Sequence, residues 1–145
     1  MKSSQMTWGY VVTAGFESWE PEAIVNKLAH LGYDAIEWTL NHFNPRSRSS
    51  SQLKQMIRTS QDQGLKNSQV AVFLDFVSGD HDIRQNNIEL TSETIQAAAE
   101  SGVSLVSIYA GPDSWDTQAP QIPTELGTSE AWGRLFAALD VLYPI

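Results

Sequence analysis

Three glycines divide the chain into a repeating pattern, and this pattern restricts the fold more than any other feature of the sequence. Gly32, Gly64 and Gly102 each follow a stretch of helical periodicity and precede a stretch rich in β-branched or aromatic residues. Glycine often ends a helix because it adopts left-handed backbone angles without strain. Strands that alternate with helices in this way predict an α/β fold with a parallel sheet and right-handed crossovers.

Four strands and four helices are expected. The strands are predicted at residues 7–14, 33–40, 69–77 and 103–110, and the third is almost continuously apolar, as in a strand covered on both faces. Pro21 suits the first turn of a helix, and a serine run precedes the second helix. The helices are therefore expected to start at Ser18 or Glu20, at Ile83 and at Ser129, with Ser50 or Ser51 as the cap of the second helix, and to end at Gly32, Gly64, Gly102 and Leu142.

Length and composition limit the classes of protein that fit. The chain has 145 residues, of which 41% are hydrophobic, so we expect a single folded domain over 1–145. A complete (β/α)₈ barrel commonly needs about 200–250 residues. The net charge of −8 disfavours partners such as nucleic acid or anionic membranes. The absence of cysteine excludes disulfides and thiolate chemistry, and the first nine residues do not read as a signal peptide, so a cytoplasmic location is expected.

Two architectures share the alternating pattern. An open flavodoxin-like sheet has helices on both faces, whereas half of a barrel has helices on one face only. Glu37 and Tyr109 lie near predicted strand ends, where a barrel has its site, and the long loops follow strands at the same end. No GxGxxG or Walker sequence indicates a nucleotide site of an open sheet. These observations favour the barrel.

Several segments together resemble one family. The run 31–38, Leu-Gly-Tyr-Asp-Ala-Ile-Glu-Trp, resembles the second-strand signature of the sugar phosphate isomerase/epimerase family, the xylose isomerase-like TIM barrels. Asp82 and Arg84 with the helix 87–102 are similar to the third unit of that family. The run 108–112, followed by Trp115, is similar to the end of its fourth strand. The resemblance implies the parallel (β/α)₄ half of a TIM barrel, truncated after the fourth β/α unit.

The resemblance also implies a chemistry, of which this chain holds only part. The family isomerises or epimerises sugars next to a carbonyl, with a divalent metal (Mn, Mg, Zn or Co) held by two Glu, one Asp and one His. Those ligands belong to strands five to eight, which the chain does not contain. No catalytic residue and no metal ligand is therefore assigned. The chain is expected to be inactive alone and to bind no cofactor.

Five side chains are candidates for contacts with a sugar or sugar phosphate: Glu37, His42, Asp75, Tyr109 and Trp115. Carboxylates and imidazole can hydrogen-bond to hydroxyls, and aromatic rings can stack on the C–H face of a sugar. Glu37 and Asp75 could also act as an acid–base pair at neighbouring strand ends. Each has a structural alternative, such as a buried hydrogen bond, an ordinary loop residue or barrel filling.

Two further residues and three functions stay open. Trp38 could stack on a sugar or fill the core, and Arg84 could hold a phosphate, although a structural ion pair is favoured. The chain could be half of an isomerase barrel that self-associates through exposed sheet edges as a homodimer. It could instead be a sugar-binding module without turnover. A regulatory open sheet is a third alternative.

Overall fold

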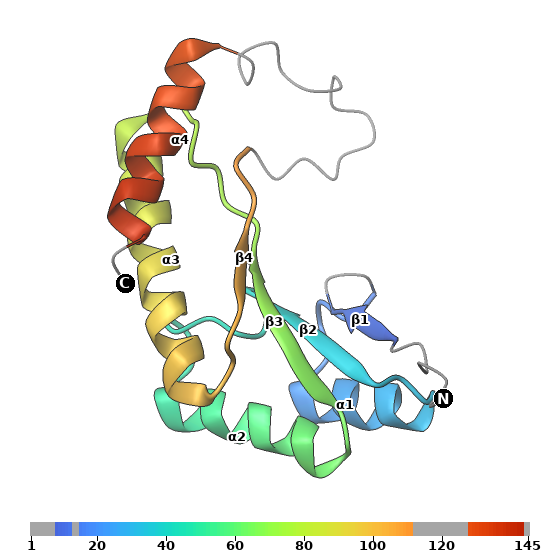
Figure 1. Cartoon of the computed structure of the whole chain (residues 1–145). Coiled ribbons are helices and arrows are strands. Elements are labelled where there is room, and N and C mark those ends of the chain that lie inside the picture. Colours follow the sequence, from blue (N-terminus) through green and yellow to red (C-terminus); the bar gives the residue numbers. More distant parts are fainter. Residues whose placement is uncertain (1–7, 13–14, 112–127, 144–145) are drawn as a thin grey trace, which may run out of the picture.

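The computed structural model describes residues 8–12, 15–111 and 128–143. Over these ranges strands and helices alternate strictly along the chain (Figure 1). In chain order the elements are β1 (Gly9–Val11), α1 (Pro21–His30), β2 (Ala35–Thr39), α2 (Ser50–Asp62), β3 (Lys66–Val72), α3 (His81–Ser101), β4 (Val106–Ile108) and α4 (Ser129–Leu142).

The sheet has the topology of half a barrel. The strands pair in the order β1-β2-β3-β4, and every pair is parallel. All four helices lie along one side of the curved sheet, and each packs against the next helix in the chain (Figure 1). An open doubly wound sheet would carry helices on both faces. The arrangement therefore confirms the predicted half barrel, with an outer face under the helices and an inner face on the inside of the curve.

The helix ends follow local capping rules. Glu20 is the cap of α1, with Pro21 in the first turn, which agrees with one of the two predicted starts. The cap of α2 is Ser49 and not the predicted Ser50 or Ser51, because Ser49 and Gln52 form a reciprocal capping box. α3 begins two residues before the predicted Ile83, because the side chain of Asp80 accepts hydrogen bonds from the first free backbone N–H groups.

The strands are shorter than predicted, and the third is displaced. β3 spans Lys66–Val72, whereas an apolar run placed it at 69–77. The polar residues at its start were missed because they pair with β2 in spite of their low β-propensity. Residues 73–77 leave the sheet, because the carboxylate of Asp75 closes a turn there.

A bulge in β3 determines which side chains share a face. Ile36 pairs with Asn67 and Glu37 with Gln69, so Ser68 has no counterpart in β2. Residues two apart normally share a face of a strand, but the extra residue of a bulge reverses that alternation. Asn67 consequently reaches α2, where it donates to the carbonyl of Ile57 at 3.2 Å, while Gln69 lies on the inner face beside Glu37.

Two hydrophobic clusters lie between the sheet and the helices. The main core joins β1–β3 to α1, α2 and α3, and it contains the fully buried Trp38. Its other large members are Val12, Ile24, Val25, Leu28, Ile36, Phe43, Leu53, Met56, Ile57, Leu65 and Val70. A separate cluster holds α4 through Phe76, Val77, Ala131, Leu135, Ala138 and Leu142. No helix in the described part of the chain has the length and apolar character needed to cross a membrane.

Candidate functional site

A hydrogen-bonded pair of polar side chains lies on the inner face of the sheet. Gln69 of β3 donates to Oε2 of Glu37 in β2 at 2.6 Å, and the two residues are direct partners in the sheet register. Their neighbours Ile36, Trp38 and Val70 point to the helices, so the pair points the opposite way. Glu37 is only half-buried. A carboxylate can accept about four hydrogen bonds, so Glu37 keeps acceptor capacity while Gln69 holds it in place.

A row of small residues follows one step closer to the carboxyl ends of the strands. Thr39, Ala71 and Ser107 occupy matching register positions in β2, β3 and β4. The hydroxyl oxygens of Thr39 and Ser107 are buried, and neither has a hydrogen-bond partner in the described part of the structure. Buried hydroxyls normally find a partner. This row is therefore small, and its two hydroxyl oxygens are covered by neighbouring atoms and not open to solvent.

An aromatic pair continues the inner face just beyond β3 and β4. The ring centroids of Phe73 and Tyr109 are 4.4 Å apart. The backbone N–H of Tyr109 still donates to the carbonyl of Val72 at 3.2 Å, which keeps the residue in line with the sheet. Tyr109 is 49% exposed. The predicted candidate thus presents an accessible ring at the end of the fold where barrel enzymes place their sites.

His42 lies in a buried position directly after β2. Its Nε2 is 3.1 Å from the carbonyl oxygen of Trp19, and its Nδ1 is buried without a partner among the described residues. A carbonyl only accepts, so Nε2 carries the proton and the neutral ring ties the loop after β2 to the loop after β1. Burial lowers the pKa of His42, against the raising effect of the backbone at Trp19 and Phe16; the nearby Arg48 charge lowers it further.

This pKa shift predicts a loss of stability in mild acid. An unfolded histidine titrates near pH 6.5, whereas folded His42 titrates lower, so between these values the unfolded chain binds more protons. The contribution of His42 is fully present above about pH 6.5 and is lost as the pH falls from there through the folded pKa. The free energy of unfolding in urea can be measured between about pH 7.5 and about pH 5, on either side of the usual histidine pKa. His42→Gln should make this free energy depend less on pH. The same change at the exposed His30 should not; equal slopes in both variants would contradict the assignment.

Asp75 and Arg84 serve the loop after β3. Oδ1 of Asp75 accepts from the backbone N–H groups of Val77 and Ser78 at 2.8 and 2.9 Å, so this oxygen closes a turn. Asp75 lies beyond the end of β3, so the predicted strand 69–77, which included this residue, was wrong at that end. Arg84 donates to the carbonyl of Ser78 at 2.6 Å, and in the described part of the chain no carboxylate lies within ion-pair distance of it.

The two tryptophan candidates differ in outcome. Trp38 is fully buried under the helices, where its Nε1 donates to Oδ1 of Asn67 at 2.7 Å. The alternative of core filling is therefore correct for Trp38, because it directly follows Glu37 in β2 and adjacent residues of a strand point to opposite faces. Trp115 lies outside the described residues.

Sequence reasoning missed Gln69, Thr39, Ser107 and Phe73 as inner-face residues. Counting in steps of two from Glu37 and Tyr109 would have found Thr39 and Ser107. The bulge hid the position of Gln69. The described residues contain no group of three or more His, Asp or Glu side chains that could hold a metal ion. The described residues therefore offer no site that fits the divalent metal implied by the resemblance.

Comparison with known proteins supports the same architecture. The family model described as xylose isomerase-like TIM barrel matches residues 25–145. A search of curated proteins found no match.

Solved structures align over nearly the whole chain. A D-psicose 3-epimerase crystallised in the presence of D-fructose is 17% identical, with a TM-score of 0.71. The alignment covers 96% of this chain and 49% of the epimerase. The D-psicose 3-epimerase of Clostridium cellulolyticum H10, with D-tagatose, is 19% identical, with a TM-score of 0.70, and the alignment covers 96% of this chain and 48% of the epimerase. The chain thus spans about half the length of these structures, and at this identity the likeness concerns the fold.

Proposed function

Because the chain belongs to the xylose isomerase-like TIM barrel family, we propose that it supplies the sugar-binding half of an isomerase- or epimerase-type pocket. The observation that carries this proposal is the Glu37–Gln69 pair on the inner face of a half barrel. A sugar presents neighbouring hydroxyls that both donate and accept hydrogen bonds. A carboxylate beside an amide offers the matching acceptors and donors at fixed positions.

The aromatic pair supports the same proposal. The exposed ring of Tyr109, braced by Phe73, can stack on the C–H face of a sugar bound at the carboxyl ends of the strands. The small residues Thr39, Ala71 and Ser107 lie between this ring and Glu37 in the sheet register. In the proposal, Glu37, Gln69 and Tyr109 bind and orient the sugar, which is a ketose or ketose phosphate.

Turnover is not assigned to this chain in the proposal. Asp75 and Glu37 share no hydrogen bond, and Asp75 closes its own turn, so they are not proposed as an acid–base pair. Isomerisation or epimerisation next to the carbonyl, together with its divalent metal, is proposed for a complete barrel. Conversion of D-fructose by the isolated chain in the presence of Mn²⁺ would replace the binding role by a catalytic one.

Titration by NMR spectroscopy tests the binding role. D-fructose, D-tagatose and a ketose phosphate should shift the resonances of Glu37, Gln69 and Tyr109. Hydrogen bonds to a charged group contribute about 1.5–3 kcal/mol, so Glu37→Gln should weaken binding by roughly 10- to 100-fold. Tyr109→Ala should weaken it by about two- to tenfold through lost stacking.

Glu22→Gln is the matched control for this titration. Glu22 is exposed on α1, on the outer side of the sheet, so its replacement should leave the affinity unchanged. A titration in which no sugar shifts any inner-face resonance would contradict the proposal. So would a Glu37→Gln variant that binds as tightly as the original chain.

A further inference from the structure

α4 carries a second apolar stripe beside the one that it buries. The side chains of the stripe recur every three or four residues, so they share one flank of the helix. The flank is largely uncovered: Trp132 is 52% exposed, Phe136 57% and Tyr143 92%, and only Leu139 is half-buried. We call Trp132, Phe136, Leu139 and Tyr143 the α4 stripe.

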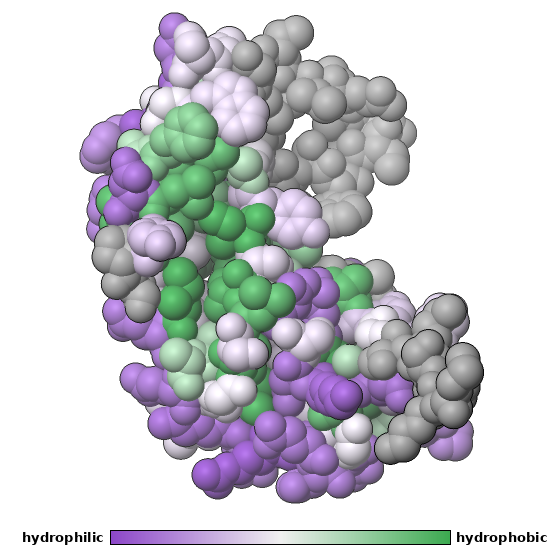
Figure 2. Space-filling model, in the orientation of Figure 1, coloured by the Kyte–Doolittle hydropathy of each residue, from purple (hydrophilic) through white to green (hydrophobic). Residues whose placement is uncertain are grey.

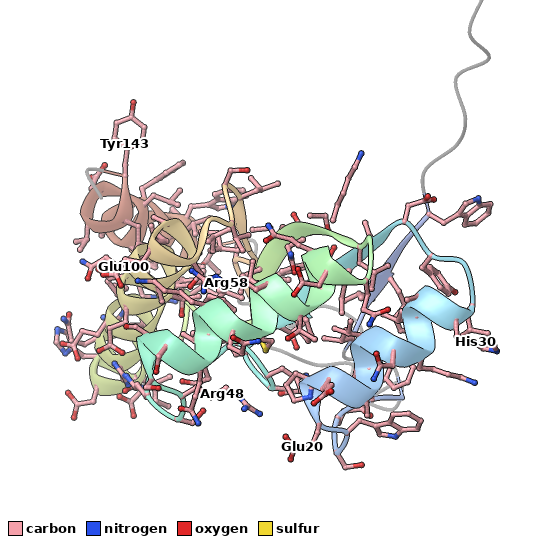
Figure 3. The ribbon with its side chains drawn as sticks, turned by 90° about the horizontal axis from the view of Figure 1, so that it is seen from below. Glu20, His30, Arg48, Arg58, Glu100 and Tyr143 are labelled. Carbon is pink, nitrogen blue, oxygen red and sulfur yellow. The ribbon has the colours of Figure 1, made fainter. Side chains whose placement is uncertain are left out.

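The α4 stripe lies at the outer end of the arc of helices. α4 is the last helix of the arc, and α3 packs against its other side (Figure 1). Trp132 lines a hollow with Ala110 and Gly111, which follow the outer strand β4. Figure 2 shows hydrophobic residues gathered over α4 and the neighbouring sheet, and Tyr143 points away from the molecule in Figure 3. A continuous apolar surface of this kind usually meets a partner.

α1 presents a complementary flank at the opposite end of the arc. Ala23, Lys27 and Leu31 recur every four residues and are exposed, Leu31 to 54%. They lie on the side of α1 away from α2, because Glu22 faces α2 across a shared hollow. We call these residues the α1 flank. It combines apolar surface with one cation and has no acidic side chain.

We propose that two copies of the chain associate head to tail about a twofold axis, with the α4 stripe of each against the α1 flank of the other. The apolar stem of Lys27 would cover an aromatic ring of the stripe, and its ammonium group would meet the ring face and Asp140, which borders the stripe. Two α4 helices packed against each other would bring the same aromatics together without any cation. Charge complementarity therefore favours α1 of a second copy as the occupant.

Interface size favours the closed pair as well. Each large aromatic side chain buries about 150–250 Å² in full, so one half-exposed stripe supplies only a few hundred Å². Stable interfaces bury about 1,200–2,000 Å². A head-to-tail pair buries the stripe twice and adds the contact between the outer strands β1 and β4. It also places the carboxyl ends of all eight strands around one hollow, so the pocket would be completed by the partner, which rests on the proposed function.

Sedimentation velocity of the full chain tests this assembly. The original chain should sediment as a dimer. Two variants, Phe136→Ala with Tyr143→Ala (the stripe variant) and Lys27→Glu (the flank variant), should each dissociate at least tenfold more readily. Ile83→Ala and Arg58→Glu are controls of the same kinds at exposed positions of α3 and α2 and should stay dimeric. Circular dichroism verifies that each variant is folded.

Mixing the two variants separates head-to-tail pairing from its alternative. In a mixed pair, the intact stripe of one variant meets the intact flank of the other, so one of the two seams is restored and dimer should reappear. A chain that is monomeric at every concentration would overturn the proposal. So would a flank variant that stays dimeric, or a mixture without recovery, as pairing of α4 with α4 requires. Monomers that still show sugar-induced shifts at Glu37 and Gln69 would leave the proposed function intact.

Discussion

Replacement of Trp38 by alanine is expected to unfold most of the chain. Trp38 is fully buried at the centre of the main core. Truncating a buried tryptophan to alanine costs about 3–5 kcal/mol. The variant also leaves Oδ1 of Asn67 without the donor that now lies 2.7 Å away, which adds about 1–3 kcal/mol. The total approaches the whole stability of a typical domain, about 5–15 kcal/mol. Urea unfolding followed by circular dichroism measures it.

Trp38→Phe separates the packing of the ring from its hydrogen bond. Phenylalanine keeps most of the buried volume and removes only the N–H donor, so the cost should be about 1–3 kcal/mol. If the alanine variant is no less stable than the phenylalanine variant, then Trp38 is not the packing centre proposed for it.

Replacement of Phe76 by alanine is expected to release α4 and leave the rest of the chain folded. Phe76 is fully buried, but it belongs to the second cluster and not to the main core. The loss is again about 3–5 kcal/mol. This loss removes a large part of the contacts that hold α4. The helix is otherwise held chiefly by α3 and by the hydrogen bond that Arg134 donates to the carbonyl of Val77 at 2.7 Å. Parts of a protein with few buried contacts open separately from the whole.

Hydrogen exchange distinguishes local from global opening in this variant. Amides of α4 should lose most of their protection, while those of α1 and β2 keep theirs. Ile57→Ala is the matched comparison, because Ile57 is equally buried but lies in the main core and should lower protection throughout. Equal losses in α4 and β2 after Phe76→Ala would mean that the two clusters open as one.

The order of elements could be predicted because local signals agreed with tertiary structure. Gly32, Gly64 and Gly102 have φ angles of 81–84°, which glycine tolerates best, and each stands where a helix gives way to a strand. α4 spans the predicted Ser129–Leu142, because its cap and apolar stripe are both local. The start of β3 could not be predicted, because polar residues at 66–69 gain their strand conformation only by pairing with β2.

The candidate site was only partly readable for the same reason. Glu37 stood out as an acidic residue in an apolar strand. Its partner Gln69 becomes visible only once the register of two strands, 32 residues apart in the chain, is known. Tyr109 could be predicted from its place at the end of a strand. The burial of Nδ1 of His42 could not be predicted, because it depends on contacts between two loops.

The bulge at Ser68 makes the lining of the inner face sensitive to the insertion or deletion of one residue in β3. Ser68 is the surplus residue that lets Gln69 stand beside Glu37 while Asn67 supports Trp38. A single-codon deletion there would restore strict alternation across the strand, so it would reverse the facing of the residues on one side of the deletion. Inserting or deleting this one residue could therefore exchange the lining presented to a ligand in a single genetic event, with no substitution at any lining position.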